Sequence, residues 1–267
     1  MKKEKTKSVS PNGSLIAHGG GNLDKDDAFK EVFSRLAGGV NAKLIYIPSA
    51  FSDDQLNGNQ QNHLSSDFAR NRFGFSNASI LHTRDRKEAD SESFVGPLME
   101  ANAVFITGGR QWRLVDSYLN TRTHKELKNL LHRGGLIAGS SAGATIQGSF
   151  LVRGNSQPDD NKIMIGDHKE GFGFIKNIAI DQHLLQQNRQ HDMLEVIRMY
   201  PDLLGVGIDV NTSILIQDSI ITVFGNSYVA VYDAQQISKE IEHSIISKIC
   251  LLQHGQRYNL ISRKLLQ

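Results

Sequence analysis

A short run of small residues around a serine is the part of the sequence best suited to chemistry. Residues 139–143 read Gly-Ser-Ser-Ala-Gly, a G-x-S-x-G pattern that follows the apolar run 135–138. Between a strand and a helix, this pattern forms a sharp turn whose small neighbours allow a tight backbone and whose central serine projects above the sheet edge. Ser141 is therefore the candidate nucleophile.

A serine hydroxyl is almost unreactive at neutral pH, so it needs a base, and the base needs an acid that orients it. His183 is the preferred base because it ends the strand-like segment 178–183, and sites on open parallel sheets collect at strand ends. Asp159 is the first candidate for the acid, and Asp160 and Glu170 are the alternatives. All three lie between the serine and the histidine in the chain.

The developing negative oxygen of an acyl transfer needs backbone N–H donors. Ala142, directly after the candidate nucleophile, supplies one. The second is expected at Gly109, which closes the turn 107–109 after the strand-like run 103–106, because glycine lets a backbone amide approach a substrate closely.

Several separated segments form one ordered pattern: Thr107, Gly108 and Gly109 with Gln111, then Gly139 to Gly143, then Asp181, Gln182 and His183 with Arg189, then Gly207, Ile208 and Asp209. In this order they resemble the cyanophycinase family and the related serine peptidases and aspartyl dipeptidases. The resemblance covers roughly residues 13–233, and the tail 251–260 is similar to the family's closing strand.

Cyanophycinases cleave a polymer with an aspartate backbone and arginine side branches, and they release a β-aspartyl-arginine dipeptide. The resemblance implies a Ser-His-acid triad without a metal or other cofactor, with Ser141 as nucleophile and His183 as base. Asp159 lies near the position where cyanophycinase has a glutamate. The same resemblance implies that four further residues line the substrate pocket, namely Gln111, Asp181, Gln182 and Arg189.

The sequence departs from the family pattern after Asp-Gln-His. Gln187 stands where the first arginine of a basic cluster is expected, Asp192 stands where a later basic residue is expected, and Leu184 replaces an aromatic residue. Arginine grips carboxylates through two parallel hydrogen bonds that glutamine does not reproduce. The reaction is therefore expected to transfer from the family better than the specificity.

Short apolar runs alternate with helix-like segments, which favours a parallel sheet covered on both faces. Strands are expected near 14–17, 43–47 and 79–81, and helices from about Asp26 and over 63–73, 94–99, 113–119 and 125–132. Residues 53–62 are expected to be a loop or a solvated helix start.

The runs 204–208, 213–216, 220–223 and 228–231 are rich in β-branched residues and predict an antiparallel extension of the sheet. The expected fold is thus α/β, doubly wound and mostly parallel, resembling class I glutamine amidotransferases. Residues 1–12 are expected to form a disordered arm, followed by one domain over 13–267.

Composition narrows the classes of function. The 267 residues carry a formal net charge of +2, which gives no support to nucleic-acid binding. The basic start is not followed by an apolar stretch, so no signal peptide is indicated and a cytoplasmic protein is expected. Cys250 is the only cysteine, and no run reaches the length of a membrane span.

Other motifs point to structure. Glycines 19–21 lack the spacing of a phosphate-binding loop, and four histidines without clustered spacing are expected at the surface or in packing, namely His18, His82, His124 and His132. The sequence predicts a peptide or cyanophycin-like substrate and, by the resemblance, a homodimer. A dipeptidase for short aspartyl or isoaspartyl peptides and a catalytically inactive binding homologue are the alternatives.

Overall fold

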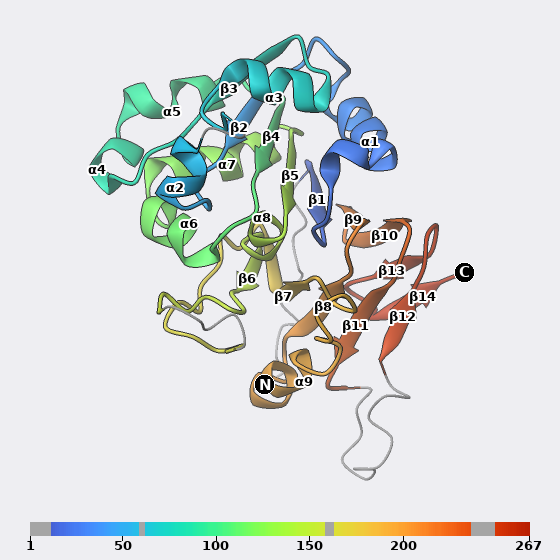
Figure 1. The fold of residues 1–267 in the computed structure, drawn as a ribbon. Coiled ribbons are helices and arrows are strands. Elements are labelled where there is room, and N and C mark those ends of the chain that lie inside the picture. The colour runs from blue at the N-terminus through green and yellow to red at the C-terminus, as the bar shows by residue number, and fades with distance from the viewer. Residues whose placement is uncertain (1–11, 59–61, 158–162, 236–248) are drawn as a thin grey trace.

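Two β-sheets form the framework of the protein in a computed structural model (Figure 1), which describes residues 12–58, 62–157, 163–235 and 249–267. The larger sheet has nine strands in the order β14-β13-β10-β9-β1-β5-β4-β2-β3, and the smaller has five in the order β12-β11-β8-β7-β6. No helix within these residues is long and apolar enough to cross a membrane.

The strands of the larger sheet are β1 (Ser14–His18), β2 (Lys43–Ile47), β3 (Asn77–Ile80), β4 (Ala103–Ile106), β5 (Leu136–Ser140), β9 (Thr212–Gln217), β10 (Ile220–Gly225), β13 (Arg257–Asn259) and β14 (Lys264–Leu266). The strands of the smaller sheet are β6 (Gly148–Phe150), β7 (Ile175–Gln182), β8 (Leu204–Ile208), β11 (Val229–Asp233) and β12 (Cys250–Leu252). The α-helices are α1 (Asp27–Ala37), α2 (Asp53–Asn57), α3 (Ser66–Phe73), α4 (Arg86–Ala89), α5 (Glu92–Met99), α6 (Gln111–Tyr118), α7 (Arg122–His132), α8 (Ala142–Thr145) and α9 (Met193–Met199).

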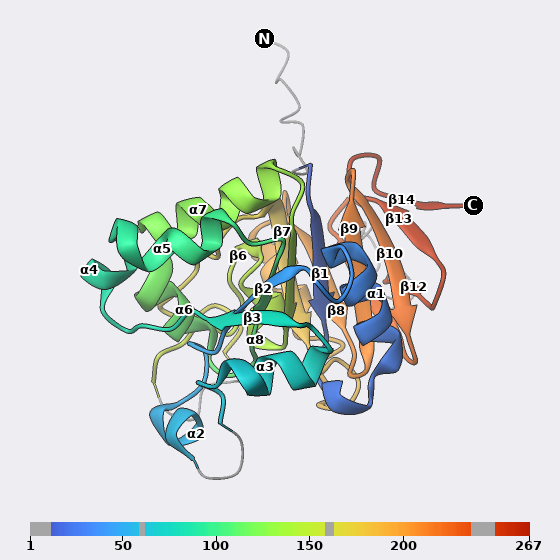
Figure 2. The ribbon, with the colours of Figure 1, turned by 90° about the horizontal axis from the view of Figure 1, so that it is seen from above.

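The parallel half of the larger sheet is buried on both faces. In β2, Leu44 and Tyr46 pack into one hydrophobic cluster with α1 and α3, whereas Ile45 and Ile47 pack into another with α5, α6 and α7. Strands that are apolar on both faces are typical of parallel sheets covered by helices. Figure 2 shows α3 on one side of β2 and β3, and α5 and α7 on the other. The predicted doubly wound sheet is confirmed.

The predicted helix starts agree with the structure. Asp26 caps α1, where its side chain accepts the Phe29 amide proton, as carboxylates commonly do at the first turn of a helix. The helices expected at 63–73, 94–99, 113–119 and 125–132 are α3, α5, α6 and α7, each within a few residues of the expected start. The polar stretch after Ser52 begins with the short helix α2.

The antiparallel extension is confirmed only in part. β9 and β10 extend the larger sheet next to β1 in antiparallel pairing. β8 and β11, which were expected in the same extension, belong to the second sheet, and β8 pairs in parallel with β7. The expected closing strand over 251–260 is likewise divided between β12 and β13, in different sheets. Apolar runs of similar composition therefore form strands of two different sheets. The sheet that each strand joins is decided by pairing partners that are distant in the sequence.

A buried histidine of α7, His124, makes the stability of the folded protein depend on pH. The Nδ1 atom of His124 accepts the Asn120 amide proton at 3.1 Å, and Nε2 donates to the Phe172 carbonyl oxygen at 2.7 Å. Both bonds fit the neutral ring. Burial lowers the pKa of His124 to about 4, so the unfolded chain binds a proton at higher pH than the folded chain does.

We expect the contribution of neutral His124 to be complete above pH 6.5 and to be lost as the pH falls toward 4, by about 3 kcal/mol in the free energy of unfolding. Urea unfolding of the wild type and His124→Gln at pH 7, 5.5 and 4 measures this. His132→Gln, which changes an exposed histidine of the same helix, is the control. An unchanged pH slope in His124→Gln would contradict the assignment.

Candidate active site

Ser141 occupies the sharp turn between β5 and α8. Its backbone has φ 53° and ψ −113°, a region that non-glycine residues adopt at a cost and that is common at functional sites. A Cβ at Gly139 would lie 2.1 Å from the Gly143 carbonyl oxygen, and one at Gly143 would lie 2.1 Å from the Ile106 carbonyl oxygen. Both glycines are therefore required by the close backbone approach, as the G-x-S-x-G pattern predicts.

His183 reaches the serine from the other sheet. It follows the last residue of β7 with φ 55°, and its Nε2 lies 3.0 Å from the Ser141 Oγ. Burial lowers the pKa of His183, the positive charge of Arg189 lowers it further, and Asp181 acts in the opposite direction. The ring is thus held in the neutral form, which is the form that accepts a proton from a serine hydroxyl.

The end of β1 joins the serine to the histidine. The Ser141 amide donates to the His18 carbonyl at 3.0 Å, and the His183 amide donates to the Gly19 carbonyl at 2.9 Å. Gly20 has φ 101°, and a Cβ there would lie 2.1 Å from the Cε1 of His183. The glycines that the sequence singled out as an unlikely phosphate loop therefore make room for the imidazole.

His18 is a positioning residue that the sequence gave no reason to select. It is fully buried, and its Nδ1 lies 3.1 Å from both the Gly20 amide nitrogen and the Ser140 Oγ. Since an amide only donates, Nδ1 is the acceptor, and Nε2–H donates to Asp26 Oδ2 at 3.2 Å. This bond is the main cause that lowers the pKa of Asp26. Ser140 lies 122 residues from His18, so no local pattern reveals the contact.

The two expected oxyanion donors lie beside the serine. Ala142 begins α8, and the first amides of a helix have no partner within it. Gly109 has φ 136°, and a Cβ there would lie 2.1 Å from the Ala50 carbonyl oxygen. The preceding residue, Gly108, lies close to the serine, since a Cβ added at Gly108 would lie 3.8 Å from the Ser141 Oγ. Within the described residues, neither the Ala142 nor the Gly109 amide donates to a backbone carbonyl.

No carboxylate among the described residues forms a hydrogen bond with His183 Nδ1. Asp159 and Asp160 lie outside them, in the segment 158–162. Glu170 is exposed, forms a bridge with Phe150 and acts electrostatically on Lys128. The Nδ1 atom of His183 is buried and makes no hydrogen bond within the described chain.

Asp209 holds the segment that follows the histidine. Its Oδ1 accepts the amide protons of Leu185 at 2.8 Å and Gln186 at 3.2 Å, and its Oδ2 accepts the Ser227 hydroxyl proton at 2.7 Å. Asp209 belongs to the ordered sequence pattern, which predicted no role for it. The structure assigns it to fixing the backbone after His183.

The four residues predicted to line the substrate pocket are buried and paired with one another or with the backbone. Arg189 donates to the backbone and side-chain oxygens of Gln182. Asp181 accepts two bonds from Arg153, both at 2.8 Å, and Gln111 donates to a backbone carbonyl. None of the four is on the walls of the cavity that contains Ser141 and His183. Their contact with substrate stays a prediction.

That cavity has a volume of about 240 Å³. Its described walls come from β2, β4 and β5, from the segments that follow β1, β2, β4, β5 and β7, and from α3. They consist of Gly20, Gly21, Leu23, Tyr46, Phe51, Arg72, Phe105, Thr107, Gly108, Gly109, Ser140, Ser141 and His183. A small, largely apolar hollow with a few converging polar groups is typical of a substrate site.

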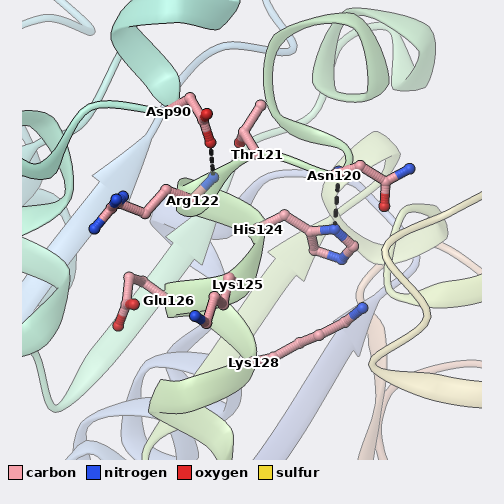
Figure 3. Close-up of a pocket in the computed structure, with 8 residues that line it drawn as sticks. All are labelled: Asp90, Asn120, Thr121, Arg122, His124, Lys125, Glu126 and Lys128. Carbon is pink, nitrogen blue, oxygen red and sulfur yellow. Dashed lines mark hydrogen bonds between the residues drawn. The ribbon is translucent and has the colours of Figure 1, made fainter.

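A second cavity of about 510 Å³ lies at the start of α7 (Figure 3). Asp90 accepts the Arg122 amide proton, and Asn120 donates to His124. Thr121 donates its hydroxyl proton to the Tyr118 carbonyl. No nucleophile and base meet there among the described side chains, so the smaller cavity is the candidate active site.

The described residues also hold no group of three metal-ligating side chains.

Gly20→Ala should reduce the reactivity of Ser141 while leaving the fold intact, because the added Cβ displaces the His183 ring. We expect the rate of Ser141 labelling by a fluorophosphonate to fall about 100-fold, the usual effect of misplacing a catalytic group by an ångström. Mass spectrometry of the labelled peptide measures the rate.

Gly38→Ala is the matched control for Gly20→Ala. Gly38 has nearly the same φ, 102°, but an added Cβ there has no neighbour within 4 Å. It imposes the same kind of backbone strain, of about 1–2 kcal/mol, without touching the histidine. Equal labelling rates in the two variants would refute the steric role of Gly20.

Comparison with known proteins identifies the family of this chain. The model of peptidase family S51 matches residues 15–224. A cyanophycinase of Geminocystis herdmanii is 28% identical over 254 residues, which is 90% of this chain and 91% of the relative. A cyanophycinase of a Nostoc species is 27% identical over 248 residues, which is 91% of this chain and 81% of the relative.

Two crystal structures share the fold. A peptidase from an acI-B1 actinobacterium has a TM-score of 0.68 at 19% identity, covering 94% of this chain and 98% of that one. A putative peptidase E from Listeria monocytogenes has a TM-score of 0.57 at 15% identity, covering 80% and 99%. Since the family model spans most of the chain, the chain belongs to peptidase family S51 and is a serine peptidase.

Proposed function

We propose that this peptidase hydrolyses amide bonds at aspartyl residues through an acyl-enzyme formed on Ser141. The observation that carries the proposal is the 3.0 Å contact between the Ser141 Oγ and the His183 Nε2. It joins a strained serine to a half-buried, neutral imidazole, and a nucleophile within hydrogen-bond reach of its base is the arrangement that serine hydrolases require.

The proposed reaction uses His183 twice. As the Ser141 oxygen attacks the carbonyl carbon, Nε2 takes the hydroxyl proton, and the carbonyl oxygen becomes negative beside the Gly109 and Ala142 amides. The C–N bond then breaks, and Nε2 gives the proton to the leaving amine. In the second half, Nε2 takes a proton from water, hydroxide attacks the acyl carbon, and the Ser141 oxygen leaves with that proton.

Aspartyl specificity rests on relatives named cyanophycinase that align over about nine tenths of the chain. A cyanophycin-like polymer, cleaved to β-aspartyl dipeptides, is accordingly the first proposed substrate. A short aspartyl or isoaspartyl peptide is the second candidate, because Asp192 stands in place of an expected basic residue and binds Arg153 at 2.6 Å. That pairing leaves less positive charge for a long polyanion.

Ser141→Ala should stay folded and lose at least about 1,000-fold in kcat, since removing a nucleophile leaves only binding and oxyanion contributions. Mass spectrometry of products from cyanophycin and from a panel of β-aspartyl dipeptides measures the loss and separates the two substrates. Ser93→Ala, an exposed serine on α5, is the control. Hydrolysis by Ser141→Ala at the wild-type rate would refute the mechanism, and absent fluorophosphonate labelling in folded wild type would favour an inactive binding homologue.

The acid of the proposed triad is Asp159, with Asp160 and Glu170 as alternatives. Replacing the carboxylate that orients His183 by its amide should lower kcat by at least about 100-fold, because the imidazole loses its orientation and its preferred tautomer. Parallel kinetics of Asp159→Asn, Asp160→Asn and Glu170→Gln identify it, and the two substitutions away from the triad serve as controls. Wild-type kcat in all three variants would exclude every one of these carboxylates.

A further inference from the structure

One arginine lines the cavity that contains the proposed nucleophile and base. Among the described residues on its walls, Arg72 of α3 is the one lysine or arginine, and its side chain is 15% exposed. Apolar side chains form much of the remaining wall. Because little water screens a charge in such a place, a cation there interacts more strongly with an anion than it would at the surface.

Aromatic rings hold the Arg72 guanidinium in position. Its Cζ lies 5.4 Å from the centroid of the Phe68 ring and 5.9 Å from that of Phe73. Contacts of this kind favour a guanidinium and fix its plane. Arg72 also acts on the Tyr46 hydroxyl, through its charge and through a side-chain hydrogen bond, but burial outweighs both and raises the pKa of Tyr46 to about 12. Tyr46 therefore stays a neutral phenol and does not neutralise the arginine.

Among the described residues, the ion pair of Arg72 with Asp24 leaves part of its hydrogen-bonding capacity for a ligand. Its Nε lies 3.1 Å from Asp24 Oδ1, and the Asp24 side chain is half exposed. Yet the Arg72 Nε is buried and makes no hydrogen bond among the described residues. A further hollow is lined by Asp24, Lys30, Phe68, Asn71 and Arg72. Arg72 therefore lines both this hollow and the cavity that contains Ser141.

The other buried arginines near His183 already have partners within the protein, which are carboxylates for Arg153 and mainly Gln182 for Arg189. Arg153 binds Asp181 and Asp192, and Arg189 lies 4.0 Å from Asp181. Neither arginine is on the cavity wall. Arg72 is therefore the cation placed to meet a substrate anion beside Ser141.

From this placement we infer that Arg72 binds the carboxylate of the substrate residue that supplies the scissile carbonyl, and so selects acidic over neutral residues there. The inference rests on the proposed function and names its specificity-determining residue. The cavity volume of about 240 Å³ is below the range typical of sites for drug-sized molecules. A cavity of this size holds the one substrate residue whose carbonyl Ser141 attacks. The group that would bind Arg72 is the side-chain or main-chain carboxylate of that aspartyl or isoaspartyl residue.

Paired substrates that differ only in aspartyl or asparaginyl at the acyl position test this assignment. The wild type should prefer the aspartyl substrate. Arg72→Met should lower kcat/KM for it by about 10- to 100-fold, the effect of one hydrogen bond to a charged group, and should leave the asparaginyl substrate within about threefold. Arg72→Lys keeps the charge but loses the planar fork, so its preference should be intermediate.

Arg70→Met is the matched control. Arg70 lies on the same helix, pairs with Asp67 at the surface and is not on the cavity wall, so the change in net charge is the same. The aspartyl preference of this variant should equal that of the wild type. Thermal unfolding of all the variants shows whether they are folded.

Binding to catalytically disabled protein makes the test independent of turnover. Calorimetry compares the aspartyl and asparaginyl peptides on Ser141→Ala and on Ser141→Ala with Arg72→Met. Carboxylate-selective binding that disappears with Arg72 supports the inference. Equal selectivity with and without Arg72, or no selectivity in Ser141→Ala alone, overturns it. If the proposed function is wrong, Ser141→Ala hydrolyses substrate at the wild-type rate. That result comes from the kinetic experiment and not from calorimetry, so failure of the proposed function and failure of the Arg72 assignment are distinguishable.

Discussion

Two adjacent peptide carbonyls at the end of β1 hold the halves of the site together. Ser141 follows β5 of the nine-stranded sheet, and His183 follows β7 of the five-stranded sheet. The His18 and Gly19 carbonyls accept the amide protons of these two residues at 3.0 and 2.9 Å. The distance between the serine oxygen and the imidazole is therefore set by how the second sheet meets the end of β1, and a shift between the sheets would change it.

Packing between the sheets maintains this alignment against local strain. Ser141 and His183 both have positive φ, and non-glycine residues in such conformations cost about 1–3 kcal/mol each unless the surroundings impose them. One hydrophobic cluster contains side chains from both sheets, including Ile106 and Ile137 of the first and Ile178, Ile180 and Val206 of the second. The same contacts that bury these strands thus bring the strained residues together, while His18 ties the end of β1 to Asp26 at the start of α1.

Local patterns predicted the parts of the site that depend on local geometry. The glycines around Ser141 and the polar end of β7 at His183 are short-range signals, and the strands before them are apolar on both faces. The division into two sheets was not predictable, because β8 and β9 have similar apolar composition and differ only in distant partners. His18 was missed for the same reason. Arg72 has the spacing of an ordinary cation on an amphipathic helix, and only the folded chain places it on the wall of the cavity that contains Ser141.

The departure from the family pattern at position 192 explains why arginines near the site divide into two kinds. With a basic residue there, Asp181 would be the one carboxylate facing Arg153, Arg189 and a third cation. Buried charges without partners are destabilising, and Asp192 instead makes the group two cations and two anions. Arg153 thus has two carboxylate partners within the protein. Arg72 differs because its partner Asp24 is half exposed and lines the adjoining hollow, whereas Arg72 lines both that hollow and the cavity that contains Ser141. Which arginine meets substrate is therefore decided by where its carboxylate partner lies, a property of the tertiary structure that sequence position alone does not reveal.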